Sequence, residues 1–352
     1  MNQNNSINIG GLEFSLDELA HIRPEKDLNK LEQFYQDPTL KNFKLKGNKV
    51  RDLIVSKLNQ SSDQFEKQTG KRPGLGIIQS GDLLQSNTYV KIKEKKAVEA
   101  GFNVFKAKFK DCVDQKMIED KIIEFNNSDL VHGFIIQLPL IPQEKFNIGE
   151  LIKQIDPTKD ADCFHPYNVG LFYSGDGYAL APATPQGTLM ILQAYGIHLE
   201  HEDKTIYSAA ISGRSDIAGK PFGRIIEAKQ NNYNVDYHLM NSRTDTKKFF
   251  KTGLYNILIS AIGKANYYRP EDVPQTTKII IDVGVNFIKN PNYVAGAKGK
   301  KGREFIQVGD FHKTAYEKAK IVVPSPGGSG PGTVAALLVN TWKLACKKEN
   351  FL

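Results

Sequence analysis

Tyr89 and Lys93 are the first residues along the chain whose types and spacing could carry out acid–base chemistry. They lie four positions apart in a segment that we expect to be helical over 86–100, so their side chains share one helix face. A lysine in a partly dry pocket can lose its proton near neutral pH and act as a general acid or base. A solvated helix face, rich in lysine, is the competing interpretation of the same pattern.

Two more polar residues stand where ligands commonly bind. Gln137 closes an apolar segment that we expect to be a strand over 132–138, and open α/β sheets bind ligands at the carboxyl ends of their strands. Asp162 lies in a long irregular segment, 156–183, where a carboxylate could hold an amino-heterocycle through two hydrogen bonds. The alternatives are a glutamine that bonds a loop and ordinary turn chemistry.

Two glycine-rich joints could approach a ligand closely. The segment from Gly213 through Arg214 and Ser215 joins an expected strand, 205–212, to a helix that starts near Gly219. Its backbone and the helix N-terminus could bind phosphate, although the GxGxxG pattern is absent and a joint without a ligand is the alternative. A Gly/Pro loop at 324–332 precedes the last expected helix, 333–347, and is either a ligand cradle or a linker.

The elements around these residues alternate between apolar strands and amphipathic helices. This order predicts βαβ units and an α/β fold with mostly parallel sheets. We expect an N-terminal extension over 1–42, with helical stretches near 15–20 and 26–36, and a first domain over 43–184 that the helix 333–347 completes. A second, dinucleotide-type domain should cover 185–325, with strands at 205–212, 233–238, 255–261 and 278–283 and a mobile insertion at 289–304.

Composition narrows the class of protein. The 352 residues carry a net charge of +8, but the lysines form no dense basic stripe, so we predict no nucleic-acid partner. The positive charge is compatible with binding of anionic small molecules. We find no apolar run long enough for a membrane span. The three cysteines are far apart and the seven histidines lack metal-binding spacing, which argues against disulfides and metal sites and favours a reducing compartment.

The first twenty residues weigh on the compartment. They contain three acidic residues and no lysine or arginine, and no apolar segment follows Met1. A secretory signal is therefore not expected, and the cytoplasm is favoured over a mitochondrion, whose import signals are basic and poor in acids.

In this order, the five segments resemble the methylenetetrahydrofolate dehydrogenase/methenyltetrahydrofolate cyclohydrolase family. The likeness covers about residues 43–347 and includes the linking segments 182–187, 281–286 and 308–310. It implies two α/β domains with mostly parallel sheets that flank a cleft, the first binding folate and the second Rossmann-like. It also implies NADP-dependent oxidation of 5,10-methylenetetrahydrofolate, hydrolysis of the methenyl product to 10-formyltetrahydrofolate, no metal, and a homodimer.

The resemblance also assigns roles to residues. Lys93 is implied as the general acid/base, Tyr89 as the residue that stacks on and orients the folate ring, and Gln137 as the support of the lysine. Asp162 is implied to bind the pterin edge. The residues implied to line the folate site are Ile136, Leu138, Pro326, Gly327, Gly328, Ser329 and Gly330. Those implied to bind NADP, with NAD as the weaker candidate, are Gly213, Arg214, Ser215, Ser242 and Val285.

The sequence departs from the family pattern in three places. Cys163 follows Asp162 where the family has glycine, at a position that could need a positive φ. Ser329 and Gly332 stand where the family usually has valine and methionine. Ser242 and Arg243, which could meet a 2′-phosphate, lie two residues too far from their expected strand. An alternative is therefore a family member with reduced or lost activity, kept as a structural or assembly subunit of a larger complex, although the four intact polar residues favour the enzyme.

Overall fold

The chain divides into two units, each with its own parallel sheet. The computed structural model describes residues 6–25, 28–110, 114–176, 180–197, 199, 207–227, 235–297 and 299–351. Apart from a few N-terminal residues, unit 1 takes Glu13–Val50 and Thr184–Thr333, and unit 2 takes Arg51–Ala183 and Val334–Leu352. Cys112 lies outside the described residues.

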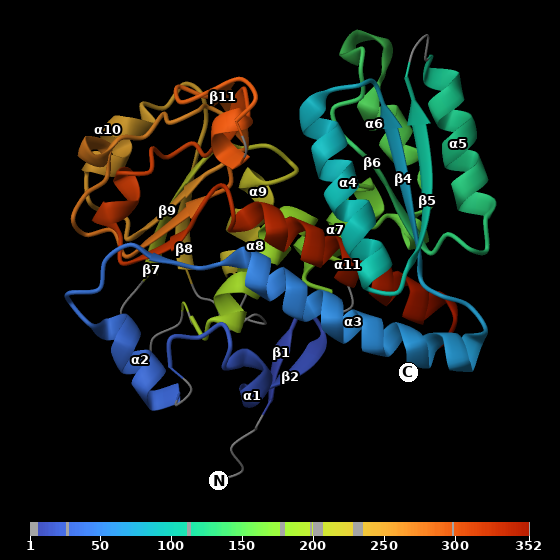
Figure 1. Cartoon of the computed structure of the whole chain (residues 1–352), viewed down its shortest axis with the longest axis horizontal. Coiled ribbons are helices and arrows are strands. Elements are labelled where there is room, and N and C mark those ends of the chain that lie inside the picture. The colour runs from blue at the N-terminus through green and yellow to red at the C-terminus, as the bar shows by residue number, and fades with distance from the viewer. Residues whose placement is uncertain are drawn as a thin grey trace. The chain divides into compact units, whose positions relative to one another are not determined.

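Unit 2 is built on a three-stranded parallel sheet of order β5-β4-β6. Figure 1 shows these strands between α4 and α5. The central strand is buried along its whole length, as strands covered on both faces are. The elements are β4 (Gly74–Ser80), β5 (Asn103–Phe109), β6 (Gly133–Ile136), α4 (Leu84–Glu99), α5 (Gln115–Asn127), α6 (Ile148–Lys153), α7 (Pro166–Ser174), and the short helices η1 (Gln143–Lys145) and η2 (Pro157–Lys159).

Two long helices continue from one unit into the other in sequence. They are α3 (Gly47–Thr69) and α11 (Ser329–Lys348). The predicted helix 333–347 is confirmed, but α11 starts at Ser329 and ends at Lys348. Residues from Val334 onward belong to unit 2. Ser329 and Gly330 therefore lie in the first helical turn and not in the preceding loop, and the following proline suits such a turn.

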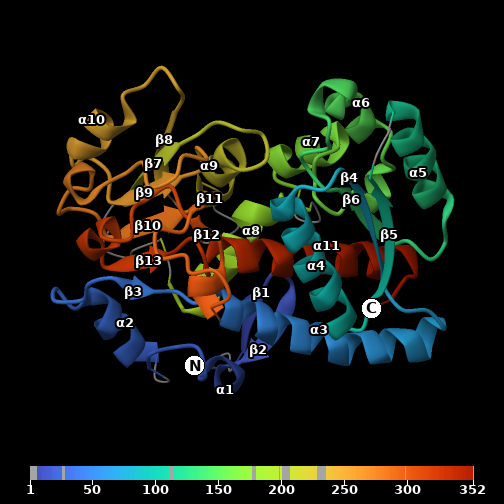
Figure 2. The ribbon, with the colours of Figure 1, turned by 45° about the horizontal axis from the view of Figure 1, so that its top comes forward.

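Unit 1 contains a six-stranded sheet of order β3-β13-β10-β9-β7-β8, whose paired strands are all parallel (Figures 1 and 2). β7 has β8 on one side and β9 on the other, which makes the carboxyl end of β7 the point where the strand order reverses. The strands are β3 (Phe43–Lys44), β7 (Tyr207–Ser212), β8 (Val235–Met240), β9 (Ile257–Ser260), β10 (Ile279–Asp282) and β13 (Ile321–Val323).

The remaining elements of unit 1 include an antiparallel pair, β11 (Asn286–Lys289) and β12 (Phe305–Val308), which frames most of the predicted insertion. Backbone bonds cross that segment from the Asn290 N–H to the Glu304 carbonyl and from the Val294 N–H to the Lys301 carbonyl, both at 2.8 Å. The other elements are α2 (Leu28–Gln36), α8 (Ala183–Ala194), α9 (Gly219–Glu227), α10 (Thr246–Lys251), η4 (Pro270–Asp272), η5 (Gly299–Gly302) and η6 (Ala315–Lys318).

The N-terminal residues are more ordered than the extension we predicted. Strands β1 (Ser6–Ile9) and β2 (Leu12–Ser15) form a two-stranded sheet, and the one-turn helix α1 (Leu16–Leu19) follows, capped by Ser15. We expected a domain to begin at residue 43, but β3 pairs with β13 in the sheet of unit 1. The fold class, α/β with mostly parallel sheets, is confirmed. No helix in the described part of the chain has the length and apolar character that a membrane span needs.

Two buried aspartates of unit 1, Asp282 and Asp310, each lie against a glycine that is close in sequence to the other aspartate. The side chain of Asp282, at the end of β10, accepts the N–H groups of Asp310 and Phe311, both at 3.0 Å. A Cβ atom on Gly309 would lie 2.0 Å from Asp282 Oδ2, and one on Gly284 would lie 2.1 Å from Asp310 Oδ1. Only glycine allows the two backbones to approach the carboxylates this closely.

We expect Gly309→Ala to lower the free energy of unfolding by about 2 kcal/mol or more, because the added methyl must displace a buried carboxylate from its donors. Gly170→Ala in α7 is the control, since no neighbouring atom lies within 4 Å of the added Cβ. That change should be neutral or stabilise by up to about 1 kcal/mol. Urea unfolding measures both, and equal midpoints for the two variants would contradict the packing argument.

Candidate active site

Lys93 and Gln137 form a buried polar contact in unit 2. Lys93 lies on α4 with 5% of its surface exposed, and its Nζ donates to Gln137 Oε1 at 3.0 Å. Gln137 follows β6 directly, so the predicted strand 132–138 was one residue too long at its start and two at its end. The Gln137 side-chain nitrogen donates to the Leu138 carbonyl at 2.9 Å, which leaves its oxygen free to accept from the lysine.

Burial moves both ionisable groups of this region toward their neutral forms. It lowers the pKa of the Lys93 ammonium, and the Asp162 carboxylate opposes that change. Burial likewise raises the pKa of Asp162, which Lys93 lowers and the nearby charge of Asp160 raises further. Lys93 can therefore gain or lose a proton nearer to neutral pH than an exposed lysine could.

Tyr89 precedes Lys93 by one helical turn of α4. Its side chain is half-buried, and burial raises the pKa of its phenol, so it stays neutral at physiological pH. Lys91 and Lys95 on the same helix are exposed. The helical pattern of lysines thus contains one buried member, which the spacing alone could not identify.

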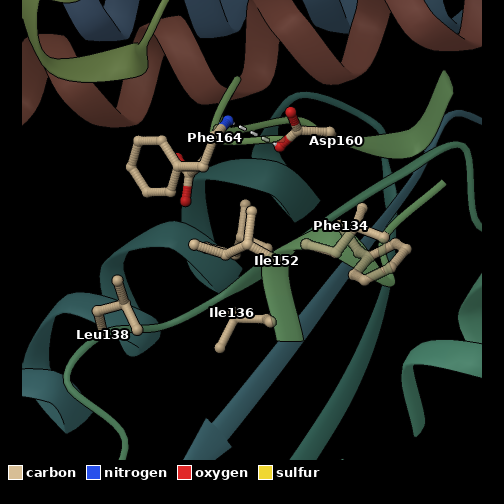
Figure 3. Close-up of a pocket in the computed structure, with 9 residues that line it drawn as sticks. Phe134, Ile136, Leu138, Ile152, Asp160 and Phe164 are labelled. Carbon is tan, nitrogen blue, oxygen red and sulfur yellow. Dashed lines mark hydrogen bonds between the residues drawn. The ribbon is translucent and has the colours of Figure 1, made fainter. Parts of the chain in front are cut away.

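The loop that carries Asp162 is fixed by the neighbouring aspartate. The carboxylate of Asp160 accepts the N–H group of Phe164 at 3.1 Å (Figure 3). It also accepts the N–H group of His165 at 2.8 Å and the side-chain amide of Asn168 at 2.9 Å. Asp162 makes no hydrogen bond to another described residue. The two acids of this segment therefore differ, since Asp160 holds the loop and Asp162 has no hydrogen-bond partner among the described residues.

Further bonds hold the same loop just before Asp162. Lys159 Nζ donates to the carbonyls of Phe125 and Ser128, at 2.8 and 2.6 Å, near the end of α5. The side-chain amide of Asn340 donates to the Ala161 carbonyl at 2.9 Å. The segment we expected to be irregular also contains α7, which starts at Pro166 after the capping residue His165.

Cys163 occupies a strained backbone position. Its φ of +58° lies in the left-handed region, as we expected of a position where the resembled family has glycine. The side chain is fully buried, and its thiol donates to the Leu180 carbonyl at 3.3 Å. Burial raises the pKa of this thiol, so Cys163 is a packing group and not a reactive thiolate.

A small cavity of about 10 Å³ borders the two aspartates, with room for roughly one water molecule. Asp160 and Asp162 provide its polar groups, and Figure 3 shows apolar side chains from β6, α6 and the loops after them around it. The cavity is lined by Phe134, Ile135, Ile136, Leu138, Ile152, Ile155, Asp160, Asp162 and Phe164. Ile136, Leu138 and Asp162, all predicted to contact folate, are thus neighbours in the structure.

The predicted phosphate loop of unit 1 lies at the carboxyl end of β7. Gly213 has a φ of +106°, and a Cβ atom there would lie 2.5 Å from the Ala261 carbonyl oxygen. A Cβ on Gly219, the first residue of α9, would lie 1.8 Å from the Gly213 carbonyl oxygen. Arg214 and Ser215, between these glycines, are exposed. The joint is tight, and its polar side chains face solvent.

The structure corrects the register of the second nucleotide strand. We expected it to end at residue 238, but β8 continues to Met240, while residues 233 and 234 lie outside the described residues. Ser242 is therefore two residues past the strand and exposed, as is Arg243. The strand that we expected ended two residues too early, and this made Ser242 seem two residues too far from it. Val285, three residues past β10, is half-buried.

The Gly/Pro loop of unit 1 is packed tightly against its own surroundings. The Gly328 N–H donates to the Pro324 carbonyl at 2.8 Å, and a Cβ on Gly47 would lie 2.2 Å from the Gly328 carbonyl oxygen. The loop contains Pro326 and Gly327, and Ser329 and Gly330 follow in the first turn of α11. A flexible linker is therefore excluded for this segment.

The structure brings some of the predicted site residues together within one unit. Unit 2 holds Lys93 and Gln137 in contact, with Asp162 close enough to act on the lysine. The glycine loop, Ser242, Val285 and the Gly/Pro loop all belong to unit 1.

Sequence reasoning missed the acids that hold these segments, namely Asp160, Asp282 and Asp310. Burial raises the pKa of Asp282 to about 7, with the charge of Asp310 as the second cause, and the hydrogen bonds that it accepts oppose the change. For Asp282 and Asp310, the available signal was a glycine near each acid, in 282–284 and 309–310.

Comparison with known proteins matches both units. The family model described as "Tetrahydrofolate dehydrogenase/cyclohydrolase, catalytic domain" matches residues 45–162, and the model of the corresponding NAD(P)-binding domain matches 182–349. The "Bifunctional protein FolD" of Natronomonas pharaonis is 35% identical over 302 residues, which is 86% of this chain and 94% of the relative. That of Streptococcus agalactiae is 33% identical over 301 residues, 86% of this chain and 96% of the relative.

Solved structures agree. The bifunctional FolD enzyme of Campylobacter jejuni superposes with a TM-score of 0.72 at 30% identity, covering 87% of this chain and 99% of the other. The methylenetetrahydrofolate dehydrogenase-cyclohydrolase of Trypanosoma brucei, solved with NADP and an inhibitor, gives a TM-score of 0.75 at 28% identity, over 86% of this chain and 97% of the other.

Asp160→Asn should lower the free energy of unfolding by about 1–3 kcal/mol, because one carboxylate oxygen becomes an amide nitrogen that faces N–H donors. Asp156→Asn is the matched control four residues earlier. Its side chain accepts from the Thr158 N–H at 2.8 Å, and asparagine serves equally well there. Chemical denaturation measures both variants, and equal losses would remove the distinction between the two positions.

Proposed function

The chain belongs to the tetrahydrofolate dehydrogenase/cyclohydrolase family, and we propose that the polar residues of unit 2 described above carry its chemistry. The enzyme oxidises 5,10-methylenetetrahydrofolate to 5,10-methenyltetrahydrofolate with NADP. It then hydrolyses the methenyl form to 10-formyltetrahydrofolate. The observation that carries the proposed residue roles is the buried hydrogen bond between Lys93 and Gln137.

The first role is to hold the folate ring. Asp162 is half-buried, makes no bond to another described residue, and lies beside a cavity bordered by Ile136 and Leu138. A carboxylate in this setting accepts two hydrogen bonds from the amide and amino edge of a pterin. The neutral phenol ring of Tyr89 offers a flat face for stacking. Together they would orient the ring so that the one-carbon unit between N5 and N10 has a fixed place.

The second role is acid–base chemistry in hydrolysis. A water adds to the methenyl carbon, forming a C–O bond, while neutral Lys93 takes a proton from it. Lys93 then gives this proton to N5 as the bond between that carbon and N5 breaks, and the remaining hydroxyl proton passes to solvent. One water is consumed, one proton is released, and Lys93 ends as it began. The lowered pKa of Lys93 and its bond to Gln137 support this assignment.

The residues of unit 1 fit a dinucleotide phosphate. The close approach at Gly213 and Gly219 leaves room for backbone alone, and the exposed Arg214 and Ser215 lie where α9 begins. Arg243, exposed just past β8, is suited to a 2′-phosphate. When bound, NADP accepts the hydride. We assign Ser242 to the ribose end and Val285 to the nicotinamide end of this site.

The larger organisation follows from the same assignment. We propose that unit 2 is the folate-binding domain and unit 1 the NADP-binding domain, and that the enzyme is a homodimer, as family membership suggests. We also propose that it works in the cytoplasm. The free, unpaired state of Cys163 and Cys346 is compatible with a reducing compartment. The alternative of an inactive assembly subunit has no support, because the relatives matched over most of the chain are bifunctional enzymes.

Lys93→Met should reduce cyclohydrolase activity by at least about a hundredfold while folate still binds, because the acid–base group is lost and the ring contacts remain. Stopped-flow loss of methenyltetrahydrofolate absorbance and equilibrium folate binding measure the two effects. The wild-type cyclohydrolase rate should fall as the pH drops through the pKa of Lys93, because the neutral amine is the active form. Burial lowers that pKa, so the fall should occur at a pH below the usual range of lysine.

Lys91→Met is the matched control on the exposed face of α4 and should leave the rate within about twofold of wild type. Unchanged hydrolysis in the Lys93 variant would remove Lys93 from its role. A folded wild-type protein that catalyses neither reaction would instead reject the proposed function itself.

Arg243→Ala should raise the KM for NADP by about tenfold to a hundredfold, because a charge-assisted bond to the 2′-phosphate is lost. The KM for NAD should not change. Arg303→Ala, another exposed arginine of unit 1, is the control and should change neither. Initial rates of methylenetetrahydrofolate oxidation with both dinucleotides provide the measurement, and a parallel rise for NADP and NAD would refute this contact.

A further inference from the structure

Two buried serine hydroxyls fasten the Gly/Pro loop to the segment that follows β10. Ser325 Oγ donates to the Gly284 carbonyl at 2.5 Å, and Ser329 Oγ donates to the Asp282 carbonyl at 2.8 Å. Ser325 is 8% exposed and Ser329 is 1% exposed. The two hydroxyls thus bond to two carbonyls that are two residues apart, beyond the last residue pair of the β10–β13 ladder. We name this pair of bonds the serine clamp.

Tyr316 extends the serine clamp to the Asp282 side chain. Its hydroxyl donates to Asp282 Oδ2 at 2.8 Å and accepts the Ser325 N–H at 3.2 Å. The same carboxylate also accepts the N–H groups of Asp310 and Phe311. The loop and the end of β10 are therefore connected through side chains that are fixed on both sides.

The serine clamp joins two segments to which we assigned different ligands. Pro326, Gly327 and Gly328 lie between the two serines, and the family resemblance implies that they line the folate site. Val285 directly follows Gly284 and is assigned to the nicotinamide end. A bond that fixes Gly284 against Ser325 therefore sets the spacing between these two segments within unit 1.

We propose that Ser325 and Ser329 are positioning residues for hydride transfer, because their hydroxyls hold the folate-lining loop at a fixed distance from the segment that contacts the nicotinamide. This inference rests on the proposed function. Hydride transfer needs its two carbons within about 3–3.5 Å, and a displacement of about 1 Å can slow a reaction a hundredfold. Hydrolysis depends on Lys93 and Gln137 in unit 2, which make no bond to the clamp among the described residues. Loss of the clamp should therefore separate the two activities.

The test compares Ser325→Ala, Ser329→Ala and the double variant with wild type. We expect Ser325→Ala, which lies outside the predicted folate lining, to lose at least about tenfold in kcat for oxidation with NADP, while its cyclohydrolase rate stays within about twofold. Ser329→Ala and the double variant should lose at least as much oxidation activity. The primary isotope effect with substrate deuterated at the methylene carbon should increase, because hydride transfer becomes more rate-limiting. A role in folding alone would lower both rates in proportion to the folded fraction and leave the isotope effect unchanged.

Ser208→Ala is the matched control. Ser208 Oγ donates to the Leu254 carbonyl at 2.9 Å near the amino end of β7. The substitution therefore removes a serine-to-carbonyl bond from unit 1 without changing the serine clamp. It should leave the ratio of the two activities and the isotope effect unchanged. The cysteine variants of Ser325 and Ser329 keep the side-chain volume with a weaker donor, and they answer the question if the alanine variants do not fold.

Equal decreases in both activities, or an unchanged isotope effect, in folded Ser325→Ala or Ser325→Cys protein would overturn the proposal. Wild-type protein that performs neither reaction would instead overturn the proposed function. An oxidation defect confined to the serine variants, with wild-type and Ser208→Ala rates equal, would support the clamp.

Discussion

A carboxylate taken out of water must be matched by donors, and this constraint separates the acids that hold the structure together from Asp162. Asp160, Asp282 and Asp310 each accept hydrogen bonds from the backbone and from side chains. Asp162 has none from another described residue, and burial together with Asp160 raises its pKa. In the proposed function, the amide edge of a pterin supplies the donors that Asp162 lacks among the described residues.

The same constraint explains what the sequence could and could not predict. Apolar strands separated by amphipathic helices were enough to predict the α/β fold and to place Gln137 at a strand end. The helical spacing of Tyr89 and Lys93 was visible, but the burial of Lys93 depends on chain segments far away in sequence. The hydrogen-bond partners of Asp160 could not be predicted for the same reason, since an Asp-x-Asp pattern does not reveal which of the two acids bonds to the backbone.

Errors in element boundaries had physical causes and altered the interpretation of the site. β8 runs two residues further than its apolar pattern suggested, and this shift restores Ser242 to a normal distance from the strand. α11 begins within a Gly/Pro segment that local propensity would exclude from a helix. The hydroxyl of Ser329 bonds the Asp282 carbonyl there, so tertiary contacts fix a turn that its glycines weaken.

The departures from the family pattern leave the contact between Lys93 and Gln137 in place. Cys163 adopts a left-handed conformation that costs about 1–2 kcal/mol for a residue with a side chain, but its buried thiol offsets part of this by packing and by its bond to Leu180. The strain lies in a loop already fixed by Asp160, Lys159 and Asn340. A loop anchored at this many points can hold a strained residue next to Asp162 without moving the carboxylate, because the anchors determine its path. A glycine at this position is therefore not required for the Asp162 carboxylate to be presented.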